Sequence, residues 1–472
     1  MRYPLVIQWF RQDLRISDNP SLSEASQHKN VLPIYILDDT NTCEYPMGAA
    51  SRFWLHHSLF SLNDSLNQNL CLYKGDPLSI LRKLCERYDV KAIFWNRCYE
   101  PWSIQRDILI KKELERQGVS VHSYNGSLLW EPWNIQKEDR TPYKVFTPFY
   151  RKGCLQAPAP RQPLSTLEKI PLYKDPKYSL EIDQLALLPN IPWDKKIQTQ
   201  WTISERGAHE RLSEFLNKGI NHYKEGRNLP AKPYVSKLSP YLHFGQISPH
   251  QVWYGAKHHG QDTDIDHFCS ELGWREFSYS QLYFNPDLPT KNLQKKFNSF
   301  PWQNNPKNLS AWQKGQTGIP FVDAGMRELW QTGYIHNRLR MVVGSFLVKN
   351  LLLHWHHGER WFWNCLVDAD LANNSASWQW VAGCGADAAP YFRIFNPVTQ
   401  GQKFDPEGIY VRKYVPELKK LPNKYLFNPW ETSQEILKDA GIELGVNYPK
   451  PIINLQTSRQ EALRAFESLQ KT

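Results

Sequence analysis

The chain has 472 residues, with 57 Lys and Arg against 47 Asp and Glu, so its formal net charge is +10. A chain of this length usually holds more than one domain, and no apolar run approaches the ~20 residues that cross a bilayer, so we expect a soluble protein of two or three domains. The eight cysteines form no CxxC pair and the N-terminal residues form no secretory signal, which predicts reduced thiols and a cytoplasmic location. The positive charge favours a polyanionic partner, and nucleic acid is one candidate.

The first third of the chain alternates short apolar runs with helical patterns. We predict strands at residues 5–10, 31–37, 70–75, 91–96 and 119–125, and helices at 51–69, 77–88 and 103–117. This alternation predicts a doubly wound parallel sheet, an α/β fold whose ligands bind beyond the carboxyl ends of the strands. No GxGxxG or P-loop follows the first strand, so a standard dinucleotide fingerprint is absent.

The rest of the chain has a different character. Residues 126–200 are irregular and rich in Pro, which predicts a long surface linker. Beyond it we predict helices at 204–221, 264–283, 319–332, 335–353 and 358–371. We therefore expect an α/β domain at 1–130, a linker at 131–200 and an all-α domain at 201–472, which holds 12 of the 19 Trp residues.

The segment 366–397 gathers carboxylates, amides and indoles. If residues 368–380 are helical, Asp370, Asn374 and Trp378 lie at i, i+4 and i+8 on one face, whereas Trp380 points roughly the other way. Such a face could hold a planar heterocycle. Composition alone favours the plainer interpretation that both Trp residues are core anchors and that the polar groups are helix caps.

Two other segments carry charge in helical patterns. The mostly apolar helix predicted within 334–355 holds Arg338 and Arg340, whose guanidinium groups require an anionic partner such as Asp368 or a phosphate. Residues 270–277 place Glu271, Trp274 and Arg275 on one face, which an ordinary surface helix also does. The run Ser236–Ser239 before a helix would suit a phosphate, although serines at helix caps are common.

Together these segments resemble the cryptochrome/DNA photolyase family, and most closely the class I cyclobutane pyrimidine dimer photolyases of bacteria. The matching motifs are WFRQDLRISDN (9–19), YKVFTPF (143–149), KLSPYLHFG (237–245), WREF (274–277), GYIHNRLRM (333–341), WQW (378–380) and DAAPYFRIFNPVTQGQKFDPEG (387–408). They are spread over essentially the whole chain, in order. The resemblance implies an α/β domain followed by a helical FAD-binding domain, and a deoxyribodipyrimidine photo-lyase that uses blue light to split cyclobutane dimers in DNA.

The resemblance also implies an FAD site. The residues assigned to it are Tyr223, Val235, Ser236, Lys237, Leu238, Ser239, Arg275, Arg340, Asp368, Ala369, Asp370 and Asn374. Arg275 would lie near the phosphates, and Asn374 would lie opposite flavin N5, where a neutral amide accommodates a protonated or a fully reduced flavin. Arg340, paired with Asp368, would favour the reduced anion. No metal is expected.

An electron relay and a lesion pocket follow from the same resemblance. The relay maps onto Trp378, Trp355 and then Trp302 towards the surface, although three Trp residues in a core more often serve packing. The pocket residues are Arg227, Glu271, Trp274, Asn337, Arg338, Met341, Trp380 and Gln400. In that pocket a flipped-out dimer would stack on Trp274 and Trp380. Glu271 would form a hydrogen bond with a base edge and assist catalysis. Arg227 and Arg338 would bind phosphates of the DNA backbone.

The pocket residues favour one substrate over others. The related (6-4) photolyases carry His at the positions of Asn337 and Met341, and an amide and a thioether cannot do that acid work. A cryptochrome-type blue-light photoreceptor is the alternative function; such receptors commonly have a long tail and altered pocket residues. A flavin oxidoreductase with a soluble substrate would not need a basic surface beside a Trp-lined cavity. We therefore expect a monomeric enzyme that binds dimer-containing DNA and no membrane.

Some positions depart from the family pattern. Val235 and Lys237 replace the usual Thr and Arg of the phosphate loop, which would loosen the hold on the FAD phosphates. Folate-binding members carry an Asn-Glu pair where this chain has Trp102 and Ser103. A second, antenna chromophore therefore has no assigned identity: a deazaflavin, another flavin, a folate or none is compatible with the sequence.

Overall fold

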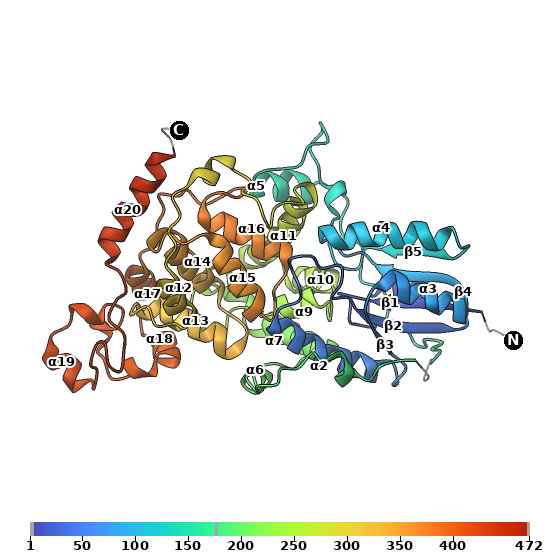
Figure 1. Ribbon diagram of the computed structural model, residues 1–472, viewed down its shortest axis with the longest axis horizontal. Coiled ribbons are helices and arrows are strands. Elements are labelled where there is room, and N and C mark those ends of the chain that lie inside the picture. Colours follow the sequence, from blue (N-terminus) through green and yellow to red (C-terminus); the bar gives the residue numbers. More distant parts are fainter. Residues whose placement is uncertain (1–3, 175–177, 470–472) are drawn as a thin grey trace. The chain divides into compact units, whose positions relative to one another are not determined.

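The computed structural model describes residues 4–174 and 178–469 (Figure 1). By the contacts between residues, the chain divides into two units. The first comprises Met1–Lys218, Ser236–Pro286 and Val367–Ala372, and the second comprises Gly219–Val235, Asp287–Leu366 and Asn373–Thr472. Each unit therefore draws on segments that are far apart in the sequence.

The first unit is built on a five-stranded parallel sheet with the strand order β3-β2-β1-β4-β5. The strands are β1 (Pro4–Phe10), β2 (Val31–Leu37), β3 (Cys71–Lys74), β4 (Asp89–Asn96) and β5 (Ser120–Tyr124). Every residue of β2 is buried, as expected for a strand that is covered on both faces. The predicted α/β fold and its five strands are confirmed, with ends that differ by at most two residues.

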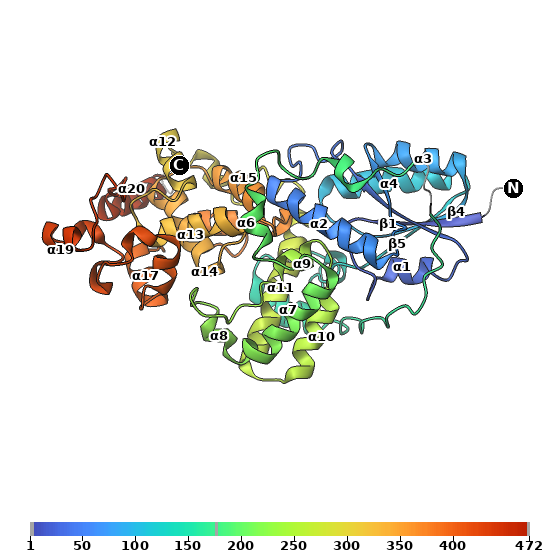
Figure 2. The same ribbon diagram turned by 90° about the horizontal axis from the view of Figure 1, so that it is seen from below.

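Alternate residues of β1 face different helices. Leu5, Ile7 and Trp9 share an apolar core with Leu81 of α3 (Pro77–Arg87) and Ile110 of α4 (Pro101–Glu115). The opposite face buries a smaller cluster that includes Val6 of β1 and Ala25 of α1 (Pro20–Ala25). Figure 2 shows α3 and α4 on one side of the sheet and α1 on the other.

The predicted linker runs back along this sheet. The described residues of 131–200 form short helical turns and isolated bridges; the turns include α5 (Phe146–Pro148), the π-helix η2 (Phe149–Cys154) and α6 (Asp194–Gln198). Isolated bridges join Leu172 to Val31 and Leu180 to Leu72. The segment is therefore anchored to β2 and β3 rather than free on the surface.

The remaining helices divide between the units. The first unit also contains α2 (Ala49–Ser65), α7 (Glu205–Lys218), α9 (Ser239–His243), α10 (Pro249–His259) and α11 (Thr263–Phe284). The second unit contains α8 (Tyr223–Gly226), α12 (Pro306–Gln313), α13 (Pro320–Thr332), α14 (Asn337–Ser345), α15 (Trp355–Cys365), α17 (Pro397–Phe404), α18 (Ile409–Tyr414), α19 (Gln434–Asp439) and α20 (Leu455–Ser468). The predicted helical character of this part of the chain is confirmed.

Three predicted helices differ from the structure in ways that bear on the site. The helix expected at 335–353 changes after α14 into the π-helix η6 (Phe346–Asn350). The helix expected at 358–371 is α15, which ends at Cys365 because Leu366 is extended (ψ 133°). The helix expected at 368–380 is α16 (Leu371–Ala382), so Asp368 and Asp370 precede it rather than lying on its face.

Two further expectations concern the chain as a whole. All eight cysteines are unpaired in the structure. Across residues 4–174 and 178–469, the structure has no helix both long enough and apolar enough to cross a bilayer.

Candidate functional site

Two buried carboxylates of the first unit are held by hydrogen bonds. Ser239 donates its hydroxyl to Oδ2 of Asp368 at 2.6 Å. Tyr279 of α11 donates its hydroxyl to Oδ2 of Asp370 at 2.5 Å, and Nδ1 of His243 lies 3.6 Å from the same oxygen. Burial would raise the pKa of Asp370, but the contacts with His243 and Tyr279 and the charge of Arg275 outweigh it and lower the pKa to about 2. Asp370 is therefore an anion at neutral pH.

Arg275 lies between this anion and a second acid. Its Nη1 donates to Oε1 of Glu276 at 3.0 Å, and its guanidinium lies 4.9 Å from the centre of the Tyr279 ring. Burial raises the pKa of Glu276 to about 7, although Arg275 and the backbone N–H of Trp130 oppose the shift. Arg275 is thus a fixed cation whose nearest acid is only partly ionised at neutral pH.

The predicted phosphate loop has one unusual backbone conformation. Lys237 has a φ of 54°, in the left-handed region, and its side chain is exposed. The Ser236 hydroxyl accepts a hydrogen bond from Leu238 N at 3.4 Å. Of the neighbouring predicted residues, Val235 and the buried Tyr223 belong to the second unit. The groups that could bind a phosphate, which are the Lys237 ammonium and the hydroxyls of Ser236 and Ser239, therefore all belong to the first unit.

Trp274 is the outer ring of a parallel stack in the first unit. Phe146 lies on one of its faces, with ring centres 3.8 Å apart and planes at 11°, and Tyr150 follows at 5.7 Å and 8°. Tyr150 packs where a Cβ on Gly273 would lie only 2.5 Å from its ring, so the glycine permits the stack. The half-buried Trp274 is thus a braced aromatic platform. Glu271, one helical turn earlier, is also half-buried.

In the second unit, α15 holds the side chain of Asn374 on α16. Nδ2 of Asn374 donates to the backbone oxygen of Glu359 at 3.0 Å, so the amide oxygen faces the other way as an acceptor. The next residue, Ser375, donates its hydroxyl to Oε1 of Glu359 at 2.5 Å. Burial raises the pKa of Glu359 to about 8, against the effects of Ser375 and Arg360. Asn374 therefore lies beside an acid that is neutral at neutral pH.

Trp378 and Trp380 have different environments, as the sequence predicted. Trp378 is 3% exposed and packs on Phe362, with ring centres 5.0 Å apart. A Cβ on Gly358 would lie 2.0 Å from Cη2 of Trp378, so glycine is required at this crossing of α15 and α16. Trp380 is half-buried, and Gln379 between them is fixed by bonds to the oxygens of residues 288 and 291.

The other two predicted relay residues share a neighbour. Trp355 is fully buried at the start of α15, and Trp302 is half-buried. The His354 ring lies 5.1 Å from that of Trp302 and 5.6 Å from that of Trp355. His354 is not among the residues predicted for the site.

Two predicted DNA-binding arginines of the second unit lie close enough to interact. Arg338 of α14 donates to the side chain of Asn228 and lies 4.2 Å from the Phe404 ring centre of α17. Burial lowers the pKa of Arg338, and the charge of Arg227 lowers it further. Because Arg227 repels it, Arg338 would gain from a nearby anion.

The other predicted residues of this unit are placed as follows. Asn337 is exposed, Met341 is half-buried, and the buried Oε1 of Gln400 has no hydrogen-bond partner among the described residues. Arg340 donates Nε to the oxygen of Ile335 at 2.9 Å. Its pairing with Asp368, which belongs to the first unit, stays a prediction.

The carboxyl edge of the sheet holds a separate cluster of charged residues, of which Arg11 is buried and the others are half-buried. Arg11 and Arg106 both pair with Asp107, and Arg106 also pairs with Asp38 at 2.9 Å. Nearby on α4, Trp102 stacks on Tyr45, with ring centres 6.2 Å apart and planes at 9°. This is the edge at which ligands of doubly wound sheets bind.

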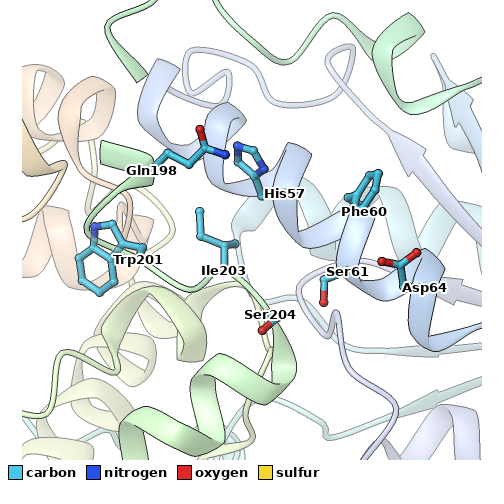
Figure 3. A pocket seen from close by; sticks show the side chains of 8 residues that line it. All are labelled: His57, Phe60, Ser61, Asp64, Gln198, Trp201, Ile203 and Ser204. Atoms are coloured by element: carbon cyan, nitrogen blue, oxygen red, sulfur yellow. The ribbon is translucent and has the colours of Figure 1, made fainter. Parts of the chain in front are cut away.

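A cavity of 310 Å³ lies elsewhere in the first unit (Figure 3). It is lined by His57, Phe60, Ser61, Asp64, Gln198, Trp201, Ile203 and Ser204. None of the residues predicted for cofactor, relay or DNA lines it.

Comparison with known proteins identifies the family. Residues 6–167 match the family described as DNA photolyase, and residues 268–468 match the FAD binding domain of DNA photolyase. The chain is 45% identical to a deoxyribodipyrimidine photo-lyase of Agrobacterium fabrum, over 99% of this chain and 98% of that protein. It belongs to the photolyase/cryptochrome family. Members include Cryptochrome-2 of Arabidopsis thaliana, 36% identical over 98% of this chain and 78% of that protein.

A solved structure of the family gives the same fold. The crystal structure of a bacterial class III photolyase from Agrobacterium tumefaciens superposes with a TM-score of 0.96 at 44% identity, covering 100% of this chain and 99% of the other. The resemblance found in the sequence is thus confirmed for the family. The finer assignment to class I is not confirmed and stays a prediction.

The family's cofactor is FAD, and the residues present fit it. Asn374 has its amide fixed with the oxygen outward, as a partner for a flavin N–H requires. Arg275 supplies a permanent cation, and the loop at Lys237 supplies hydroxyls and a second charge, as a diphosphate requires. When bound, FAD supplies the light absorption and electron transfer of the family's chemistry.

The raised pKa of Glu359 predicts a pH dependence of stability. Between its ordinary value of 4.5 and about 8, folded Glu359 keeps a proton that the unfolded chain has lost. The free energy of unfolding should therefore fall as pH rises, by up to ~1.4 kcal/mol per pH unit, and Glu359→Gln should remove this contribution. Denaturant unfolding of both proteins across this pH range tests it; parallel stability curves would show that Glu359 titrates normally.

Proposed function

We propose that the chain is a deoxyribodipyrimidine photo-lyase that uses light to split cyclobutane pyrimidine dimers in DNA. The observation that carries the proposal is the 45% identity, over nearly the full length of both chains, to a protein of that name. The 36% identity to Cryptochrome-2 leaves a photoreceptor as the weaker candidate. The braced ring of Trp274 supports repair, because a base flipped out of the duplex needs an aromatic face to replace its lost stacking.

Each lesion-pocket residue has a proposed task. Trp274 and Trp380 would stack on the flipped pyrimidines, and Glu271 would bond a base edge and stabilise the charge that develops there. Arg227 and Arg338 would bind phosphates, which would relieve their mutual repulsion. Asn337, Met341 and Gln400 would complete the pocket; the unpartnered oxygen of Gln400 suits an amino group of a ligand.

The cofactor residues have matching tasks. Arg275, Ser236, Lys237 and Ser239 would hold the FAD phosphates, with Tyr223, Val235 and Leu238 beside them. Asp368, Ala369, Asp370 and Arg340 would lie at the flavin, and Asn374 would present its fixed amide oxygen at N5. The neutral state of Glu359 keeps negative charge away from this position, as the reduced cofactor requires.

Trp378, Trp355 and Trp302 would form the electron relay. Trp378 of α16 packs on Gly358 of α15, and Trp355 lies three residues before Gly358 on α15. The crossing of these two helices therefore positions both indoles. Indole is oxidised more readily than most side chains, which suits it to this role. Trp302 is half-buried, as the outer member of a relay should be.

The proposal extends to the subclass, the antenna site and the cellular location. The sequence favoured class I, whereas the solved structure at 44% identity is that of a class III photolyase, so either subclass suits the chain. An antenna chromophore would bind at the carboxyl edge of the sheet, beside Arg11, Arg106 and the Tyr45–Trp102 stack. We propose a cytoplasmic monomer that acts on dimer-containing DNA.

Light dependence tests the proposed activity directly. The purified protein should contain flavin, and DNA carrying thymine dimers should regain the absorbance of intact bases under near-UV to blue light but not in darkness. Undamaged DNA under the same light is the control. Tight binding of dimer-containing DNA without repair under light would favour the photoreceptor function instead.

Substitution of Trp380 tests the lesion platform. Trp380→Ala should weaken binding of dimer-containing DNA by ~1–3 kcal/mol, because one stacking partner of the flipped base is lost. Trp330→Ala is a matched control, since Trp330 is 60% exposed and stacks on Trp361 outside the predicted pocket. Equal affinities of wild type and Trp380→Ala would remove Trp380 from the pocket.

Substitution of Trp302 tests the relay. Trp302→Phe should block light-driven reduction of oxidised FAD, because phenylalanine is much harder to oxidise than tryptophan. Repair by the chemically reduced variant should stay at the wild-type rate. Trp361→Phe should leave both activities unchanged, and normal photoreduction in Trp302→Phe would reject the relay.

A further inference from the structure

His354 occupies the space between two proposed relay residues. Its ring lies 5.1 Å from that of Trp302 at an interplanar angle of 62°, and 5.6 Å from that of Trp355 at 28°. All three residues belong to the second unit. One imidazole is therefore in contact with both indoles.

The backbone holds these rings in place. Gln303 N donates to the oxygen of Leu352 at 2.8 Å, and Gln303 forms an isolated bridge with Leu353, so the loop that carries Trp302 runs beside the segment that carries His354. Asn292 accepts a hydrogen bond from Nε1 of Trp355 at 2.9 Å. Hydrogen bonds to neighbouring residues therefore hold the Trp302 loop beside the His354 segment and fix the indole of Trp355.

His354 also caps α15. Its Nδ1 accepts a hydrogen bond from the backbone N–H of His356 at 3.2 Å, so the imidazole is fixed as well. Burial, together with the charges of His357 and Arg360, lowers the pKa of His354 to about 4. At neutral pH the ring adds no positive charge beside an oxidised indole, where a cation would oppose the hole.

We propose that His354 is the bridge of the relay, through whose ring an electron tunnels from Trp302 to oxidised Trp355. Trp355 gains one electron and Trp302 loses one, the imidazole keeps its own electrons, and a thiol in solution re-reduces Trp302. The transfer is faster through packed ring atoms than through an unfilled gap. This inference rests on the relay of the proposed function, and it makes His354 a positioning residue for electron transfer.

Two substitutions separate the ring of His354 from its capping bond. His354→Asn removes the ring but keeps an acceptor that is favoured at a helix N-cap, whereas His354→Phe keeps a ring and loses the cap. After a light flash, transient absorption should show that oxidation of Trp302 is lost in His354→Asn and retained in His354→Phe. Repair by the chemically reduced variants should stay at the wild-type rate.

Three outcomes would overturn the bridge. Normal Trp302 oxidation in His354→Asn would show that the ring is dispensable. Loss of that oxidation in His354→Phe with intact repair would assign the effect to the cap rather than to the ring. If Trp302→Phe, measured in the same experiment, photoreduces like the wild type, the relay itself is wrong and the bridge with it. A block in Trp302→Phe beside a normal His354→Asn would reject the bridge alone.

Discussion

The close crossing of α15 and α16 is the constraint on which most of the candidate site depends. Gly358 lets the indole of Trp378 lie where any side chain would collide with it. One residue later, the backbone of Glu359 fixes the amide of Asn374, and its carboxyl group binds Ser375. A single close contact therefore sets an indole, an amide and a neutral acid in fixed relation, which is the preorganisation that electron transfer and cofactor binding require.

In both units the energetic cost of burying an acidic group is offset. The Asp370 anion has Arg275, His243 and Tyr279 around it, so its burial is compensated. Near Asn374, by contrast, the buried acid Glu359 avoids the cost of burial by keeping its proton. The arginines at 227 and 338 repel each other, so an anion bound close to both would be stabilising.

Local pattern was enough to predict the sheet and most helices, because each strand of a doubly wound sheet is a short apolar run and each helix has a 3.6-residue period. Local pattern did not predict the helix ends that depend on contacts between residues far apart in the sequence. The π-helix η6 continues α14 without a break in apolar pattern, and α16 begins late because Ser239 and Tyr279, more than eighty residues away, hold the carboxylates before it. Resemblance supplied the site residues, and Phe146 lies within one of its motifs, but its stacking on Trp274 became visible only in the folded chain. Glu359 and His354 act through neighbours that only folding brings together, and neither was among the predicted site residues.

The bridge between Leu180 and Leu72 has a consequence for association. Leu72 lies on β3, the outer strand of the sheet, whose unpaired backbone groups would otherwise be a template for another chain. The proline-rich segment supplies hydrogen bonds to that strand from within the same molecule. By pairing with β3, this segment blocks part of the sheet edge from pairing with a second chain, and a shorter connection that bypassed β3 would leave that edge open.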